Sequence, residues 1–81
     1  MNYEKAFEEM IETIKEFGQC SVFLADEDEI AISPATDYVG GEDGHYMSDV
    51  LGNIQYNNIE EICQDVLDFI DGRKIDSIEV D

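Results

Sequence analysis

Positive charge is scarce in this sequence. Its 81 residues contain four Lys and Arg against 21 Asp and Glu, which gives a formal net charge of −17. The chain is also rich in Ile, Asn, Tyr and Phe, a usage typical of A/T-rich genomes, which normally supply abundant Lys as well. Self-repulsion of this size also destabilises a compact domain. Because Lys is nevertheless scarce, we infer that positive charge has been kept out of the chain.

Long apolar runs are absent, and cysteines are few. No stretch approaches the roughly 20 apolar residues of a membrane-spanning helix, and the net charge opposes binding to an anionic lipid surface. The first residues lead directly into a charged amphipathic pattern in place of a signal peptide. We therefore expect a cytoplasmic protein that does not contact membranes, with Cys20 and Cys63 reduced and buried.

The side chains that catalysis needs are sparse as well. His45 is the single histidine and lies in a Gly-rich acidic stretch, while Cys63 flanks the apolar face of a predicted helix, where a structural thiol is typical. No serine lies in a nucleophile-elbow motif, and carboxylate pairs are too abundant here to carry information. We expect no catalytic residues, and we predict that the chain is not an enzyme.

Metal and nucleic-acid sites are excluded on similar grounds. Two Cys and one His do not match the spacing of zinc ligands. The Asp26-x-Asp28 pair resembles the start of a calcium loop, but Ile30 stands where a third oxygen ligand belongs, and Ala31 replaces the Gly of the turn. We expect no metal, no cofactor and, because the surface repels phosphate, no direct contact with nucleic acid.

Composition favours one folded domain spanning residues 1–81. Hydrophobic residues make up 43% of the chain and aromatic residues 10%, which is enough for a core and too much for a disordered acidic tail. A domain this short buries a smaller share of its surface than a large one, so we expect its stability to be marginal.

Two amphipathic helices are predicted from apolar residues at helical spacing. The first has Tyr3, Phe7, Met10, Ile11, Ile14 and Phe17 on its apolar face and ends at Gly18. The second begins at the N-cap Asn58, with Glu61 three residues on as in a capping box, and is stopped by Gly72. Its apolar face consists of Ile59, Ile62, Val66, Phe69 and Ile70, flanked by Cys63 and Leu67.

Strands are predicted between and after the helices. Residues 19–25 and 29–33 are rich in β-branched and aromatic side chains, and Pro34 ends the second of these segments. Glycines mark residues 36–44 as a loop, and at least one strand is expected within 45–56, where Gly52-Asn53 offers a turn between two extended segments. With a last strand at 74–80, the order is α-β-β-β-α-β. This predicts an α+β fold with two helices packed on a small, mostly antiparallel sheet.

The acidic residues are arranged in rows and clusters. On the first helix, Glu8, Glu12 and Glu16 follow one another at i, i+4 spacing. Such like-charge pairs destabilise a helix by roughly 0.2–0.5 kcal/mol each. A sequence that keeps them without any gain in local stability indicates that the charges serve a function. We predict that the partner-binding residues are Glu8, Glu9, Glu12, Glu16, Asp26, Glu27, Asp28, Glu29, Glu42, Asp43, Asp65 and Asp68.

The spacing of these rows suggests what they bind. One helical turn rises about 5.4 Å, which is near the spacing of successive phosphates along a nucleic-acid strand. A row of carboxylates on a helix can therefore present negative charge much as a nucleic-acid backbone does. A basic groove built for phosphates would gain steering and counterion release from it. The predicted partner is a basic nucleic-acid-binding protein.

In size, charge and element order, the chain resembles the small acidic phage-encoded anti-CRISPR and anti-restriction proteins, several of which are DNA mimics. The resemblance is to the class, without a family motif, and it draws on the whole-chain acidity, the Glu8/Glu9/Glu12/Glu16 face and the run Asp26-Glu27-Asp28-Glu29. It implies an inhibitor that occupies the positively charged DNA- or PAM-binding groove of a CRISPR effector or similar nuclease. Such a protein would act in the cytoplasm of a bacterial host cell, as a monomer or small homo-oligomer.

Two other interpretations fit the same sequence. An immunity protein or antitoxin that neutralises a basic nuclease toxin would use the same electrostatics against a different target. An accessory interaction domain could carry the charge for solubility alone, and it would then tolerate charge reversal on either helix.

Overall fold

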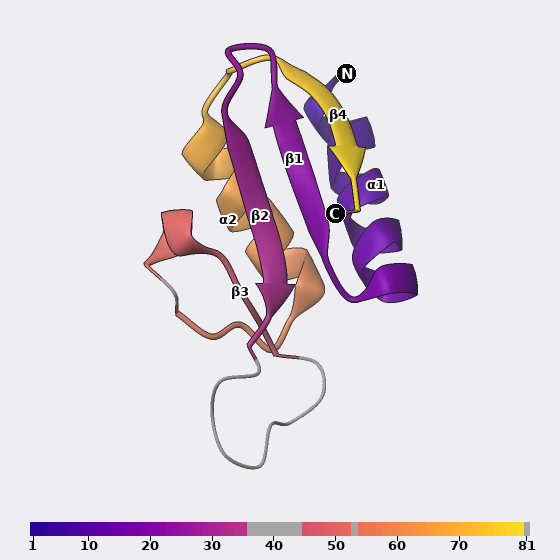
Figure 1. The fold of residues 1–81 in the computed structure, drawn as a ribbon, viewed down its shortest axis with the longest axis vertical. Helices are drawn as coiled ribbons and strands as arrows, with labels where there is room; N and C mark the ends of the chain where they lie inside the picture. The colour runs from indigo at the N-terminus through magenta and orange to yellow at the C-terminus, as the bar shows by residue number, and fades with distance from the viewer. Residues whose placement is uncertain (36–44, 53, 81) are drawn as a thin grey trace.

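The computed structural model describes residues 1–35, 45–52 and 54–80. Two helices lie side by side on one face of a four-stranded sheet (Figure 1). The predicted loop at 36–44, with Glu42 and Asp43, and the predicted turn residue Asn53 lie outside the described residues.

The element order confirms the predicted α-β-β-β-α-β arrangement. The elements are α1 (Tyr3–Phe17), β1 (Cys20–Leu24), β2 (Glu29–Pro34), β3 (Tyr46–Met47), the 3₁₀ helix η1 (Asp49–Leu51), α2 (Ile59–Ile70) and β4 (Ile75–Glu79). The strands lie in the order β3-β2-β1-β4, and each neighbouring pair is antiparallel.

Short polar side chains and left-handed residues set the ends of both helices. The Asn2 Oδ1 accepts from the Lys5 N–H at 2.8 Å, and the predicted cap Asn58 accepts from the Glu61 N–H at 3.0 Å. Gly18, at φ 80°, ends α1 as predicted. The predicted stop of α2 at Gly72 is one residue late, because Asp71 already adopts the left-handed conformation at φ 47°.

The core lies between the sheet and the helices. Alternating residues of the two central strands point toward the helices and are buried, namely Cys20, Val22 and Leu24 of β1 and Ile30 and Ile32 of β2. Each helix buries the side chains that face these strand residues. They are Ala6, Met10 and Ile14 of α1, and Ile62, Cys63, Val66, Leu67 and Ile70 of α2.

Two aromatic residues assigned to the helix faces lie outside this core. Phe17 is 57% exposed at the last residue of α1, and Phe69 is 45% exposed. Cys63 and Leu67, predicted to flank the apolar face of α2, are buried instead. The reason is that α2 packs against α1 as well as the sheet, so its buried arc widens over Cys63 and Leu67 and leaves Phe69 outside.

Between β2 and α2, the described residues 45–52 and 54–58 form the short strand β3, the 3₁₀ helix η1 and an isolated bridge. Tyr46 of β3 lies opposite Pro34 of β2. The second extended segment predicted in this stretch, at 54–56, forms only an isolated bridge, in which the N–H groups of Tyr46 and Tyr56 each donate to the other's carbonyl, at 2.8 and 2.7 Å. In the described ranges, no helix has the length and apolar character needed to cross a membrane.

Burial of the two thiols gives a test of the packing. Desolvation raises the pKa of Cys20 and of Cys63 to about 12, so both should stay protonated and unreactive in the folded protein. We expect no reaction with a thiol reagent at pH 8 until a denaturant unfolds the chain, whereupon both thiols react. Because these pKa values are raised on folding, the free energy of unfolding should fall as the pH rises from about 8.5, where unfolded thiols ionise. Rapid labelling of the native protein would contradict the packing.

Candidate acidic binding surface

The predicted row on α1 is present at the surface. Glu8, Glu12 and Glu16 are exposed on the helix face opposite Met10 and Ile14, which are buried in the core. Glu9 is half-buried at one flank of this face. Helical spacing places Lys5 one turn before Glu8 and Glu9, and Lys15 within one turn of Glu12 and Glu16. The row is therefore strongly negative, with one cation near each end.

A second row lies on the outer face of α2. Its exposed members are Glu60, Glu61 and Asp68, and Asp68 accepts from the Gln64 side chain at 3.0 Å. Asp65 is half-buried, because its Oδ2 accepts from the Tyr56 hydroxyl at 2.7 Å. That hydrogen bond is the largest cause of the raised pKa of Tyr56. Asp65 thus attaches the chain preceding α2 to the helix, and less of its charge is available to a partner.

The two rows share one outer surface. The helices contact each other on the same side of the sheet (Figure 1). They run in opposite directions, since α1 ends where β1 begins, while α2 leads into Ile75, which lies opposite Leu24 at the end of β1. The rows on α1 and α2 are therefore antiparallel, and Glu12 and Glu16 of the α1 row also border β4, because they line a groove with Ile78.

The third predicted cluster forms the tip of the β1–β2 hairpin. The Leu24 N–H donates to the Asp28 carbonyl at 2.9 Å, and the Glu27 N–H donates to the Leu24 carbonyl at 3.1 Å. Glu27 adopts φ 73°, the left-handed position that this type of three-residue loop normally fills with Gly. Asp26 and Asp28 accept backbone N–H groups at 3.1 and 3.0 Å, so their carboxylates help to shape the turn. Glu29 begins β2 and is exposed.

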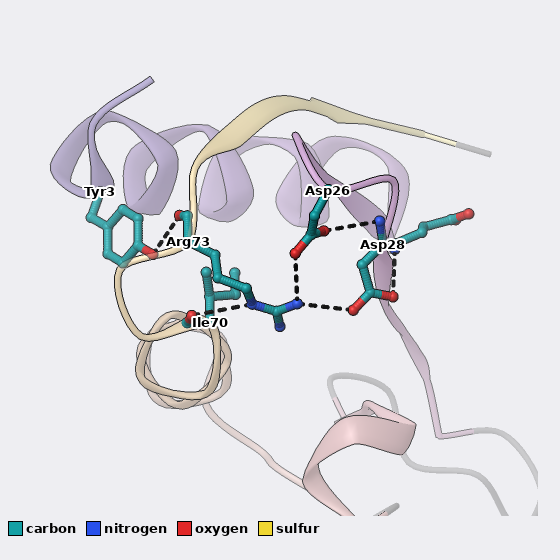
Figure 2. A network of polar contacts seen from close by, with 6 residues as sticks. Tyr3, Asp26, Asp28, Ile70 and Arg73 are labelled. Atoms are coloured by element: carbon teal, nitrogen blue, oxygen red, sulfur yellow. Dashed lines mark hydrogen bonds and ion pairs between the residues drawn. The ribbon is translucent and has the colours of Figure 1, made fainter.

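Arg73 interrupts the negative charge of this tip (Figure 2). Its Nη1 lies 3.3 Å from the Asp26 Oδ2 and 3.1 Å from the Asp28 Oδ2. The run Asp26-Glu27-Asp28-Glu29 is therefore not uniformly negative in the folded protein, because Arg73 pairs with two of its four carboxylates. The hydrogen bond that Arg73 donates to Asp28 is the largest of the effects that raise the pKa of the Arg73 guanidinium.

The same arginine joins three elements at one end of the molecule. Its Nε donates to the Ile70 carbonyl at 3.3 Å, and its guanidinium carbon lies 5.7 Å from the centre of the Phe69 ring. The Arg73 carbonyl accepts from the Tyr3 hydroxyl at 2.7 Å. The hairpin tip, the end of α2 and the start of α1 are thereby held together (Figure 2).

The predicted partner-binding residues that the structure describes consequently fall into two groups. The antiparallel helix rows form one acidic surface, whereas the hairpin tip lies at the end of the molecule where α2 ends and α1 begins. Glu16, at the far end of α1, therefore lies remote from the tip. Sequence reasoning missed Arg73, because its partners Asp26 and Asp28 are 47 and 45 positions away, and no spacing signals such a contact.

The residues of the described part include no group of three or more His, Cys, Asp or Glu that could hold a metal ion. The fold and surface define a two-layer α+β domain whose helices present carboxylates away from the sheet. Comparisons with models of known protein families, with curated proteins and with solved structures find no match for this chain. Its role must be argued from the surface itself.

The backbone of Glu27 gives a test of whether acidity here opposes stability. A left-handed non-Gly residue costs roughly 1–2 kcal/mol, and Gly loses part of this gain through its own entropy. Glu27→Gly should therefore raise the free energy of unfolding by roughly 0.5–1 kcal/mol in denaturant titrations. Glu27→Gln is the control, because it removes the charge and keeps the strain. An equal gain in both variants would assign the effect to charge.

The Arg73 contacts predict a local effect. Arg73→Gln should speed hydrogen exchange at the Leu24 and Glu27 amides, because the tip loses its link to the end of α2. Lys74→Gln removes the same charge from the neighbouring exposed residue, and exchange at these amides should stay unchanged. Equal acceleration in the two variants would show that Arg73 acts through net charge alone.

Proposed function

We propose that this protein is an inhibitor that binds the basic nucleic-acid-binding groove of a nuclease, such as a CRISPR effector, in the cytoplasm of a bacterial cell. The observation that carries the proposal is the pair of antiparallel carboxylate rows on the outer surface of α1 and α2. They lie on a chain with 21 acids and four cations. In this interpretation the rows occupy positions where the groove would otherwise hold phosphates.

The arrangement of the helices supports this use of charge. Carboxylates on a packed helix project from a fixed backbone, so meeting a complementary row of Lys and Arg costs side-chain freedom but no ordering of the backbone. A basic groove binds polyanions largely by releasing condensed counterions and by long-range attraction. A compact surface of net charge −17 would be steered to such a groove rapidly, and more so at low salt.

The acids also stand where they do not help the fold. Asp68 lies in the last turn of α2, where the helix dipole disfavours negative charge by a few tenths of a kcal/mol. Glu27 and Asp71 are the non-glycine residues with positive φ among those described, and both are acidic. Negative charge is thus retained at positions where neutral or basic residues, or Gly, would be more stable. Selection for binding explains this pattern directly.

Capture from a lysate, eluted with a salt gradient, tests the partner class. Nucleases or other nucleic-acid-binding proteins should be retained, elute steeply with salt and be displaced by added DNA. Capture of a toxin nuclease in place of a CRISPR effector would favour the immunity-protein interpretation. A partner that is insensitive to both salt and DNA would overturn the proposal.

Kinetics with the captured target then test the α1 row. Reversal of Glu9, Glu12 and Glu16 to Lys should slow association at least tenfold at low salt and have less effect at high salt. Reversal of Asp49, Asp71 and Asp76 is the control, because these exposed acids lie outside both helix rows and their reversal changes the net charge by the same amount. Unchanged inhibition by a folded α1 variant would contradict the assignment, and equal slowing in both variants would show that overall charge does the steering.

A further inference from the structure

The strand β4 forms an edge of the sheet. Within the described ranges it pairs with β1 and with no second strand. Figure 1 shows it along one border of the sheet, with α1 behind it. The Met1 ammonium donates to the Ile75 carbonyl at 3.3 Å and so covers the first position of this edge. The remainder of β4 is a template for another strand.

The register identifies which backbone groups point outward. Leu24 donates its N–H to Asp28, so alternate residues of β1, including Val22, direct their backbone groups toward β2. The intervening residues of β1, Ser21 and Phe23, direct their backbone N–H and C=O groups toward β4. There Ser21 lies opposite Glu79, and Phe23 lies opposite Ser77. Ile78 lies between Ser77 and Glu79 in β4. Its N–H and C=O therefore face the free edge, as do those of Val80 beyond the strand.

A groove with acidic walls runs beside this edge. It lies between α1 and β4, has a volume of about 210 Å³, and is lined by Glu9, Glu12, Thr13, Glu16 and Ile78. The half-buried Ile78 side chain supplies an apolar surface, and three carboxylates of α1 lie around it. A strand added to β4 would direct alternate side chains toward this groove.

From the free edge and its acidic wall, we infer that β4 accepts an extended basic segment of the partner as an added strand. Backbone hydrogen bonds to Ile78 and Val80 supply the pairing. Lys or Arg side chains at alternate positions reach the carboxylates of α1 and select a basic segment over other strands. A second copy of this chain is a poor occupant, because it brings Asp76, Glu79 and a net charge of −17 to the same edge.

This inference rests on the proposed function only for the basic character of the partner. It adds a contact that charge mimicry does not need, namely main-chain pairing at one defined strand. The two can therefore fail separately. A target whose groove binds the helix rows without contacting β4 would leave the proposed function standing and remove the inference.

The probe is a synthetic ten-residue peptide of alternating Lys and Thr, titrated into the isotope-labelled full-length protein. We expect chemical-shift changes along residues 76–80 and at least fivefold slower hydrogen exchange of the Ile78 and Val80 amides. A peptide with the same number of Lys but Pro at alternate positions cannot form a strand ladder. It should leave exchange at these amides unchanged. Equal protection by both peptides, or shifts confined to α2, would overturn the inference.

Matched variants test the wall and the edge. Glu9→Gln with Glu16→Gln should weaken binding of the Lys-Thr peptide at least fivefold. Glu4→Gln with Asp49→Asn, which removes the same charge from exposed positions outside the groove and outside the helix rows, should change it less than twofold. Val80→Pro deletes one outward N–H at an exposed position and should weaken binding without unfolding the domain. Equal loss in the two double variants, unaltered binding by Val80→Pro, or a dimer that the peptide does not dissociate would refute strand addition.

Discussion

Repulsion among like charges is the constraint to which the rest of this structure responds. With 21 acids and four cations in 81 residues, folding brings carboxylates together that the unfolded chain keeps apart. None of the described acidic side chains is buried, and nearly all are exposed, so water and salt screen most of the repulsion. The cohesion must then come from apolar burial, and the core is built almost entirely from Ile, Val, Leu, Met, Ala and Cys.

Several polar contacts of the described residues lie at the ends of elements. Both helices begin at a neutral Asn side chain rather than at a further carboxylate. The two ion pairs whose partners lie in the described part of the chain both belong to Arg73. That residue neutralises part of the hairpin tip through Asp26 and Asp28 and ties the tip to the end of α2 and the start of α1. One cation therefore offsets the repulsion between these two carboxylates.

Much of the fold was predictable because local rules determine it. The spacing of Met10 and Ile14 indicated the first helix. Asn58 indicated where the second helix begins, and Pro34 indicated where a strand ends. The errors arose where packing decides. Phe69 is exposed and Cys63 buried because α2 packs on α1 as well as on the sheet, and sequence periodicity contains no information about the second neighbour. The acidic row on α1 was predictable for the same reason that the helix was.

The sequence by itself determined the charge, the two amphipathic helices, the order of the elements and the outward position of most carboxylates, because these follow from composition and from contacts within a few residues. The tertiary structure decided which acids share a surface. It set the two helices side by side, turned Asp65 toward Tyr56, and placed Arg73 against a hairpin more than 40 positions away. Among the described residues, it also left β4 paired with β1 alone, next to Glu9 and Glu16. These features depend on contacts between residues distant in sequence, which are fixed only when the helices and the sheet pack around a common core.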